Sequence, residues 1–235
     1  MNKFLIFIGI VLFLSSCKKT TTTEELPTPV QDVVGFVSLY DQYGDYQQNG
    51  AGVTVSLDST SFSATTDSNG KFVLKNVPTG YYTVTYSKSG YITYKSSYSN
   101  LLGGQAYLLP GINLYAPSIN VVTYLTAGYD SLISLYQVAS VVGPTNVTGE
   151  QKSAMLFIGF TPAVSATNYV EAIYIGNTGN EFENGYSFTN YSGKTIYIVG
   201  YGATTDYSYL NAATEQYVYT ALSATPSNVA TLTIP

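Results

Sequence analysis

The stretch TDSNGKFVLKNVPTGYYTVTYSKSGY, residues 66–91, decides the fold of the first half of this 235-residue chain. Its Asn69-Gly70 dipeptide stands between two strand-like runs, and Asn-Gly tolerates the positive φ angles that a tight hairpin turn requires. After the turn, residues 81–87 alternate apolar and polar side chains. Period-two alternation is typical of a half-buried β-strand. The stretch therefore predicts short antiparallel strands that are joined by tight turns.

Working outward from this stretch, short motifs follow one another in a fixed order. They are Gly35-Phe36-Val37, Gly52–Val55, Thr66–Phe72, Val77–Val84 and Lys88–Tyr91. This ordered set resembles the carboxypeptidase regulatory-like domain, a transthyretin-like β-sandwich, over roughly residues 33–114. The resemblance implies a sandwich that serves as an accessory module, because in that family the matching residues are turn and core positions and not catalytic ones.

The second half of the chain also reads as short strands, which turn signals such as Gly143-Pro144 and Ser192-Gly193 separate. The predicted strands cover residues 120–126, 132–142, 154–161, 169–175, 186–189, 195–202, 216–223 and 229–234. Residues 194–224 are similar to the last two strands of fibronectin type III-like modules. We therefore expect an immunoglobulin-like or fibronectin III-like sandwich of unspecified topology.

The N-terminus has the pattern of an export signal. A basic start, Met1–Lys3, precedes the apolar run Phe4–Leu14, which is far shorter than the roughly 20 residues of a membrane-spanning helix. The following Leu14-Ser15-Ser16-Cys17 resembles the lipobox of bacterial lipoprotein precursors. That resemblance implies cleavage before Cys17 and acylation of its thiol, and multiple acyl chains hold a protein firmly on a membrane. The alternative interpretation is an ordinary signal peptide with a chance cysteine.

These patterns predict an all-β chain with two consecutive β-sandwich domains. The expected parts are a lipoprotein signal peptide at 1–16, a flexible tether at 17–31, a carboxypeptidase regulatory-like sandwich at 32–116 and the second sandwich at 117–235. The expected location is the cell envelope, on the outer membrane of a Gram-negative bacterium, with the periplasmic or surface face left open.

Composition excludes several classes of function. The net charge is −5 and the nine cations are all lysines, so the clustered Arg and Lys of nucleic-acid binding are missing. Without His, the commonest general base and metal ligand is absent, and a single Cys excludes an intrachain disulfide. We expect no cofactor and no metal. Asp58, Asp67 and Asn69 supply too few carboxylates for calcium, so a turn is the favoured interpretation of Asp67–Gly70.

Tyrosine is the most conspicuous candidate for binding, because the chain has 24 of them. Tyr combines a rigid apolar face with a hydroxyl, which suits contact with sugar rings and protein surfaces. We single out Tyr201, Tyr207 and Tyr209 as a ligand-facing platform. The alternative is that these residues only cover sheet faces.

The leading functional hypothesis is a non-catalytic lipoprotein that binds or displays glycan or protein partners. A subunit of a surface nutrient-uptake or adhesion assembly is the alternative. A glycoside hydrolase would need paired carboxylates, for which Glu171, Glu181, Glu183 and Asp206 are the late-chain candidates. Ser59 and Ser131 each lie in a short Asp-Ser pattern that matches bacterial O-glycosylation sites, and the sequence leaves their modification open.

Overall fold

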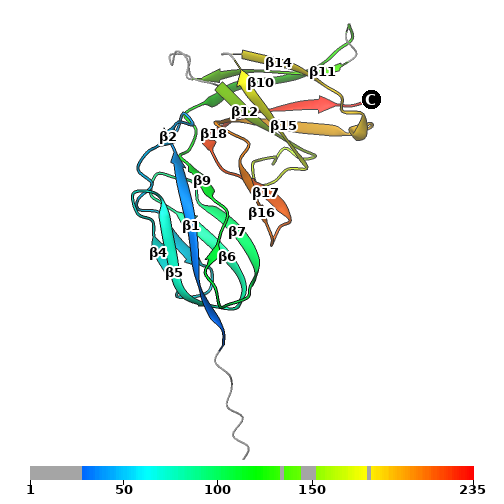
Figure 1. Cartoon of the computed structure of the whole chain (residues 1–235). Coiled ribbons are helices and arrows are strands. Elements are labelled where there is room, and N and C mark those ends of the chain that lie inside the picture. The colour runs from blue at the N-terminus through cyan, green and yellow to red at the C-terminus, as the bar shows by residue number, and fades with distance from the viewer. Residues whose placement is uncertain (1–27, 133–134, 144–151, 179–180) are drawn as a thin grey trace, which may run out of the picture.

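A computed structural model describes residues 28–132, 135–143, 152–178 and 181–235 and shows two β-sandwiches in succession (Figure 1). In these ranges every regular element is a strand except one 3-10 turn, η1 (Thr189–Tyr191). The predicted all-β class is therefore confirmed. None of the described segments forms a helix that is long and apolar enough to cross a membrane. The predicted signal peptide, Cys17 and most of the predicted tether lie outside the described residues.

The first sandwich consists of two sheets that enclose one apolar core. One sheet has β1 (Val30–Tyr40) at its centre, with β2 (Tyr46–Gln47), β5 (Lys71–Pro78), β8 (Tyr107–Leu108) and β9 (Ile112–Tyr115) as its partners. The other sheet has the order β4 (Ser63–Thr65), β3 (Thr54–Leu57), β6 (Gly80–Ser87), β7 (Tyr94–Leu101). Alternate residues of β1 are buried, as a strand with one core-facing side requires. The strand begins at Val30, inside the predicted tether, because Val30 and Gln31 pair with Pro78 and Val77 of β5.

The Asp67–Gly70 turn is present, but it is not a hairpin within one sheet. The carboxylate of Asp67 accepts hydrogen bonds from the amides of Asn69 and Lys71, which fixes the turn without a metal. Gly70 has a φ of 75°, and a Cβ at this position would lie 2.0 Å from the Val37 carbonyl oxygen. The turn carries the chain from β4 in one sheet to β5 in the other. At this crossing Gly70 lies directly against β1, where a side chain would not fit.

The second sandwich again has two sheets. One has the order β10 (Val121–Asp130), β11 (Leu135–Gly143), β14 (Glu181–Tyr186), and the other has the order β13 (Glu171–Thr178), β12 (Lys152–Gly159), β15 (Thr195–Ala203), β18 (Leu222–Thr233). A separate hairpin pairs β16 (Ser208–Asn211) with β17 (Gln216–Tyr219). The division of the chain into domains at residue 116 stays a prediction.

Two predicted strands of the second sandwich are wrong in detail. The expected strand at 186–189 is replaced by β14, which ends at Tyr186 and pairs residue by residue with β11. The expected strand at 216–223 is two strands, because the chain turns at Ala221, whose φ is 93°. The partner of β15 is accordingly the long β18, and β17 pairs with β16 instead.

Strand β12 is buried on both faces along its whole length. One face, with Leu156 and Ile158, joins the core between the two sheets. The opposite face, with Met155 and Phe157, joins a separate cluster that also contains Val199 and Val164. A sheet in a two-layer sandwich ordinarily turns one face to water. In the second sandwich, therefore, a third layer covers the outer face of this sheet.

Candidate functional site

The β16–β17 hairpin supplies part of this third layer, and it presents two different faces. Ser208 pairs with Tyr219 and Leu210 pairs with Tyr217, and directly opposed residues of an antiparallel pair lie on the same side. Tyr209 lies on the other side, because successive side chains of a strand alternate. One hairpin therefore presents tyrosines in two opposite directions.

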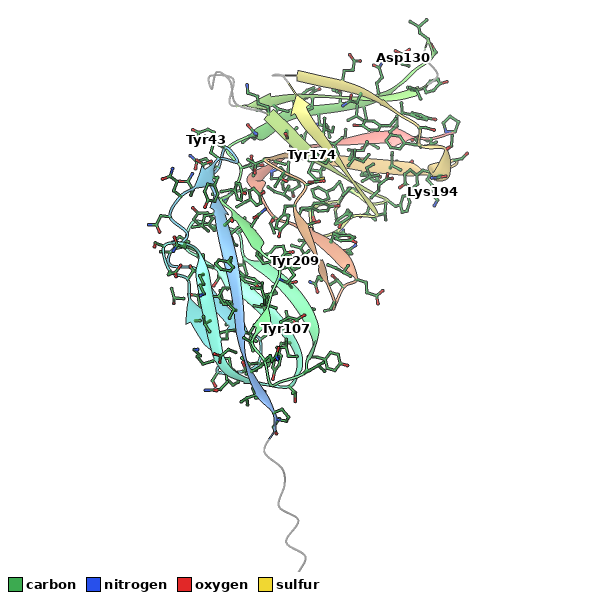
Figure 2. All side chains as sticks on the ribbon, in the orientation of Figure 1. Tyr43, Tyr107, Asp130, Tyr174, Lys194 and Tyr209 are labelled. Carbon is green, nitrogen blue, oxygen red and sulfur yellow. The ribbon has the colours of Figure 1, made fainter. Side chains whose placement is uncertain are left out.

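The Tyr209 face of the hairpin packs against the first sandwich. The ring of Tyr207 stacks on Tyr94 of β7 with centroids 5.1 Å apart, and Tyr209 meets the same ring edge-on at 5.2 Å. Tyr207 also contacts Tyr115 of β9 at 5.7 Å. Figure 2 shows Tyr209 at this junction between the two sandwiches. These tyrosines therefore connect one sandwich to the other.

The Tyr217 face of the hairpin borders a hollow of about 270 Å³ over the outer face of β12 and β13. We call it the tyrosine hollow. It is lined by Met155, Ala172, Tyr174, Asp206, Ser208, Tyr217 and Tyr219. Tyr174 and Tyr217 are 37% and 54% exposed. The hollow thus offers accessible aromatic rings beside a carboxylate and a hydroxyl.

The walls of the tyrosine hollow are held in place from below and from the side. The ring of Tyr219 lies edge-on to the buried Phe157 with centroids 5.6 Å apart. The hydroxyl of Tyr169 donates a hydrogen bond to the Tyr217 carbonyl oxygen at 2.7 Å, and the Gln216 side chain donates to the Tyr169 carbonyl oxygen at 3.0 Å. The hairpin is therefore tied to the loop that precedes β13, and the Tyr219 ring is preorganised.

Burial and a nearby carboxylate disfavour ionisation of one tyrosine of the hollow, Tyr219. Burial raises the pKa of Tyr219, and the nearby Asp206 carboxylate and Tyr217 raise it further. Burial likewise raises the pKa of Tyr169. Both hydroxyls consequently stay protonated at neutral pH; that of Tyr169 holds the hairpin, and that of Tyr219 can donate into the hollow. A ligand in the hollow would therefore contact aromatic rings, neutral hydrogen-bond donors and one carboxylate acceptor.

The three tyrosines selected from the sequence do not form one platform. Tyr207 and Tyr209 face the first sandwich, whereas Tyr201 lies edge-on to Phe157 at 5.6 Å on the outer face of β15, beneath the third layer. Their contact with a ligand stays a prediction. The sequence analysis missed Tyr174, Tyr217 and Tyr219. The two-residue spacing of Tyr217 and Tyr219 could have indicated a shared face. It does so only if these residues belong to a strand, and what that face covers depends on the 208–219 hairpin.

The carboxylate candidates are dispersed. Glu171 starts β13 and accepts a hydrogen bond from the Tyr191 hydroxyl, whose pKa is raised to about 12 by burial and by this carboxylate. Glu181 and Glu183 belong to β14 in the other sheet and not to the loop that we expected. Asp206 is the single carboxylate among the described residues that line the tyrosine hollow.

A second hollow, of about 460 Å³, lies on the outer face of β10 and β11 and includes Asp130 and Glu183. Glu183 is opposite Ala139 and Asp130 is opposite Leu135, so the two acids are four residues apart along β11. At about 3.4 Å per residue this is roughly 13 Å of backbone, which exceeds the roughly 5–10 Å that glycoside hydrolysis requires. Asp130 already accepts hydrogen bonds from Leu132 and Gln137.

The remaining sequence candidates lie in turns. Ser59 is exposed with a φ of 61° in the turn between β3 and β4, and Ser131 is exposed in the turn after β10. Their modification stays a prediction. In the part of the chain that the structure describes, no group of three or more His, Cys, Asp or Glu side chains is placed to hold a metal.

Comparison with known proteins gives a family match within the first sandwich. The sequence model of the carboxypeptidase regulatory-like domain matches residues 44–110. The resemblance stated from the sequence is therefore confirmed for this stretch, which runs from the loop before β2 to the loop before β9. No curated protein matches the chain.

Several solved structures resemble the chain at low structural scores. A cohesin–X-dockerin complex from Acetivibrio cellulolyticus is 28% identical over 37% of this chain, which spans only 58% of that one, with a TM-score of 0.32. A DUF3823 family protein from Parabacteroides merdae is 13% identical over 87% of this chain and 99% of its own, with a TM-score of 0.31. A protein from Bacteroides uniformis, provisionally named as carbohydrate-binding, is 10% identical over 88% of this chain and all of its own, with a TM-score of 0.33.

Proposed function

We propose that this chain is a lipid-anchored, non-catalytic protein of the cell envelope whose second sandwich binds a glycan in the tyrosine hollow. The observation that carries the proposal is the grouping of Tyr174, Tyr217 and Tyr219 around one hollow beside Asp206. Tyr faces stack on the apolar face of a sugar ring, and a few polar groups then fix its orientation. A single carboxylate suits recognition of hydroxyls better than cleavage of a glycosidic bond.

The size of the tyrosine hollow limits what it binds. Its volume of about 270 Å³ is at the small end of the roughly 300–1,000 Å³ that is usual for ligand pockets. One sugar ring therefore fits inside, and the rest of a longer glycan would extend outward. Because the chain has few charges near this site, we propose a neutral glycan as the ligand.

Binding to a glycan array or by titration calorimetry tests this function. In the double variant Tyr174→Ala/Tyr217→Ala, affinity should fall about tenfold or more, which corresponds to roughly 1.4 kcal/mol, because both accessible rings are removed. Tyr124→Ala is the matched control, since Tyr124 is 58% exposed but lies on the other sheet. Equal affinity of the double variant and the control would contradict the proposed site.

The anchoring part of the proposal is supported by the sequence Leu14-Ser15-Ser16-Cys17 after the short apolar run. Metabolic labelling with a fatty acid should mark the mature wild-type protein, and Cys17→Ser should abolish both the label and membrane association. Membrane fractionation that still recovers the unlabelled variant in the membrane would contradict the anchor.

A further inference from the structure

Exposed apolar side chains gather at one end of the first sandwich. The residues are Val30, Tyr81, Leu102, Tyr107 and Leu108, and we call them the apolar pole. Tyr81, Leu102 and Leu108 are 77%, 72% and 65% exposed. The described part of the first sandwich has seven exposed large apolar residues, and five of them belong to this pole. Isolated exposed apolar residues need no explanation, but a grouping marks an interaction surface.

Backbone hydrogen bonds bring the segments of the apolar pole together. The Val30 carbonyl oxygen accepts from the Gly104 amide at 3.0 Å, which places the start of β1 beside the loop after β7. Gly80, next to Tyr81, pairs with Leu101, next to Leu102. Tyr107 and Leu108 pair with Val33 and Val34 farther along β1. The segments that carry these five residues therefore lie side by side at one end of the sandwich.

The apolar pole has no charge of its own. Residues 28–31, 76–87 and 96–110 contain no Asp, Glu, Lys or Arg. The bordering Asp32 and Lys75 neutralise each other in an ion pair with an Nζ–Oδ2 distance of 2.7 Å. A partner that binds through charge complementarity has no charged group to contact at the pole. A neutral apolar or interfacial surface can bind there without one.

The pole lies at the end of the sandwich from which the N-terminal segment leads to Cys17. β1 begins there, and its other end points toward the second sandwich (Figure 1), where the Tyr40 carbonyl oxygen accepts from the amide of Ala116, the last residue before that sandwich. Thirteen residues along the chain lead from Cys17 to Val30. Such a segment spans at most about 45 Å even when fully extended. A membrane anchor at Cys17 therefore keeps the pole within about 45 Å of the bilayer.

We propose that the apolar pole rests on the lipid bilayer, with Tyr81, Leu102 and Leu108 in the headgroup region. This inference rests on the proposed lipid anchor. Tyr is well suited to the membrane–water interface because its ring is apolar and its hydroxyl remains hydrated. Leucines inserted to the boundary of the acyl chains add apolar contact. Since the pole is uncharged, its contact with lipid should not depend on anionic lipids or on salt.

The orientation has a consequence for display. β1 has 11 residues and spans about 33 Å at roughly 3.3 Å per residue. With its first residue at the bilayer, its last residue and the second sandwich are held away from the membrane. The tyrosine hollow is then presented to the solvent side, where a glycan chain has room to approach.

The absence of Trp from the chain allows a direct test. Leu102→Trp and Leu108→Trp each place one fluorophore in the pole, and Leu132→Trp is the matched control at the far sandwich, since Leu132 is 93% exposed. Each acylated full-length variant is reconstituted on phosphatidylcholine vesicles whose acyl chains carry bromine near the headgroup. Emission of the two pole variants should fall at least about twofold and shift to the blue, and the control should not change. High salt should leave both results unaltered.

Flotation of the same vesicles separates this inference from the anchor. If the protein floats with the vesicles and the pole variants are not quenched, the anchor holds and the proposed contact is overturned. If the protein does not float, the anchor fails, and quenching at saturating vesicle concentration then decides the contact by itself. The proposed contact is also overturned if the quenching disappears in high salt, or if the pole variants are quenched no more than Leu132→Trp.

Discussion

The two sandwiches differ in how many faces of a sheet they bury. In the first sandwich, β1 alternates buried and more exposed residues, so its sheet has one core face and one outer face. In the second sandwich, every residue of β12 is buried, because the β16–β17 hairpin and the loop before β13 cover its outer face. The third layer, present only in the second sandwich, creates both the tyrosine hollow and the junction between the sandwiches.

The largest effect is expected from removing an outer-face aromatic ring. Phe157→Ala should lower the free energy of unfolding by about 3–5 kcal/mol, because Phe157 is fully buried under Tyr169, Tyr201 and Tyr219. Phe36→Ala is the matched control, since Phe36 is on the outer face of β1 and is 45% exposed. Urea denaturation followed by circular dichroism measures both. Similar losses in the two variants would mean that the sandwiches do not differ in this way.

The close approach of Gly202 to the Asn120 carbonyl oxygen predicts a somewhat smaller loss of stability. A Cβ at Gly202 of β15 would lie 1.8 Å from the Asn120 carbonyl oxygen, so the segment before β10 must move. Gly202→Ala should therefore destabilise the protein by about 3 kcal/mol. Gly128→Ala is the control, because a Cβ at Gly128 meets nothing within 4 Å. If the melting temperatures of the two variants match, the strand and the segment are not in contact.

The junction can be separated from the tyrosine hollow. Tyr207→Ala/Tyr209→Ala removes the rings that contact Tyr94 and should weaken the coupling between the sandwiches by roughly 1–2 kcal/mol. Calorimetry should then resolve two unfolding transitions, and small-angle scattering should show a broader range of sizes. Tyr217→Ala, on the opposite hairpin face, should leave one transition. A single transition in the double variant as well would assign the coupling to other contacts.

The smallest effect is expected for the ion pair of Asp58 and Lys95 in the first sandwich, whose contribution to stability depends on pH. Hydrogen bonds from Lys95, at 2.8 Å, and from Thr85 hold the pKa of Asp58 below its ordinary value. A carboxyl whose pKa is lower in the folded state stabilises the protein above its unfolded pKa and loses this contribution as pH falls through the folded pKa. Because Asp58 and Lys95 are 34% and 43% exposed, the contribution is only about 0.5 kcal/mol.

The corresponding measurement is the difference in unfolding free energy between about pH 6 and about pH 3. This difference should be smaller in Asp58→Asn than in the wild type, because the variant has no carboxyl to protonate. Asp45→Asn, at an exposed position outside this ion pair, should keep the wild-type difference. An unchanged difference in Asp58→Asn would show that the pair contributes nothing.

Much of the strand pattern followed from the sequence, and the failures have clear causes. The alternation in residues 81–87 and the turn at Asp67–Gly70 are both present in the structure. Strand β14 was missed because Glu181-Phe-Glu-Asn-Gly-Tyr186 is polar and contains glycine, and only its pairing with β11 makes it a strand. The separation of β17 from β18 was missed because it occurs at Ala221, and alanine is not a residue type that usually adopts a positive φ.

The sequence by itself determined the strand periodicity, the positions of most turns and the lack of charge at the pole, because these depend on neighbouring residues and on composition. Only the tertiary structure decided that the Asp67–Gly70 turn crosses between sheets, and that Tyr207 and Tyr209 join the sandwiches while Tyr217 and Tyr219 line a hollow. The physical reason is that alternation shows that a strand has two faces, but what covers each face depends on residues distant in the chain.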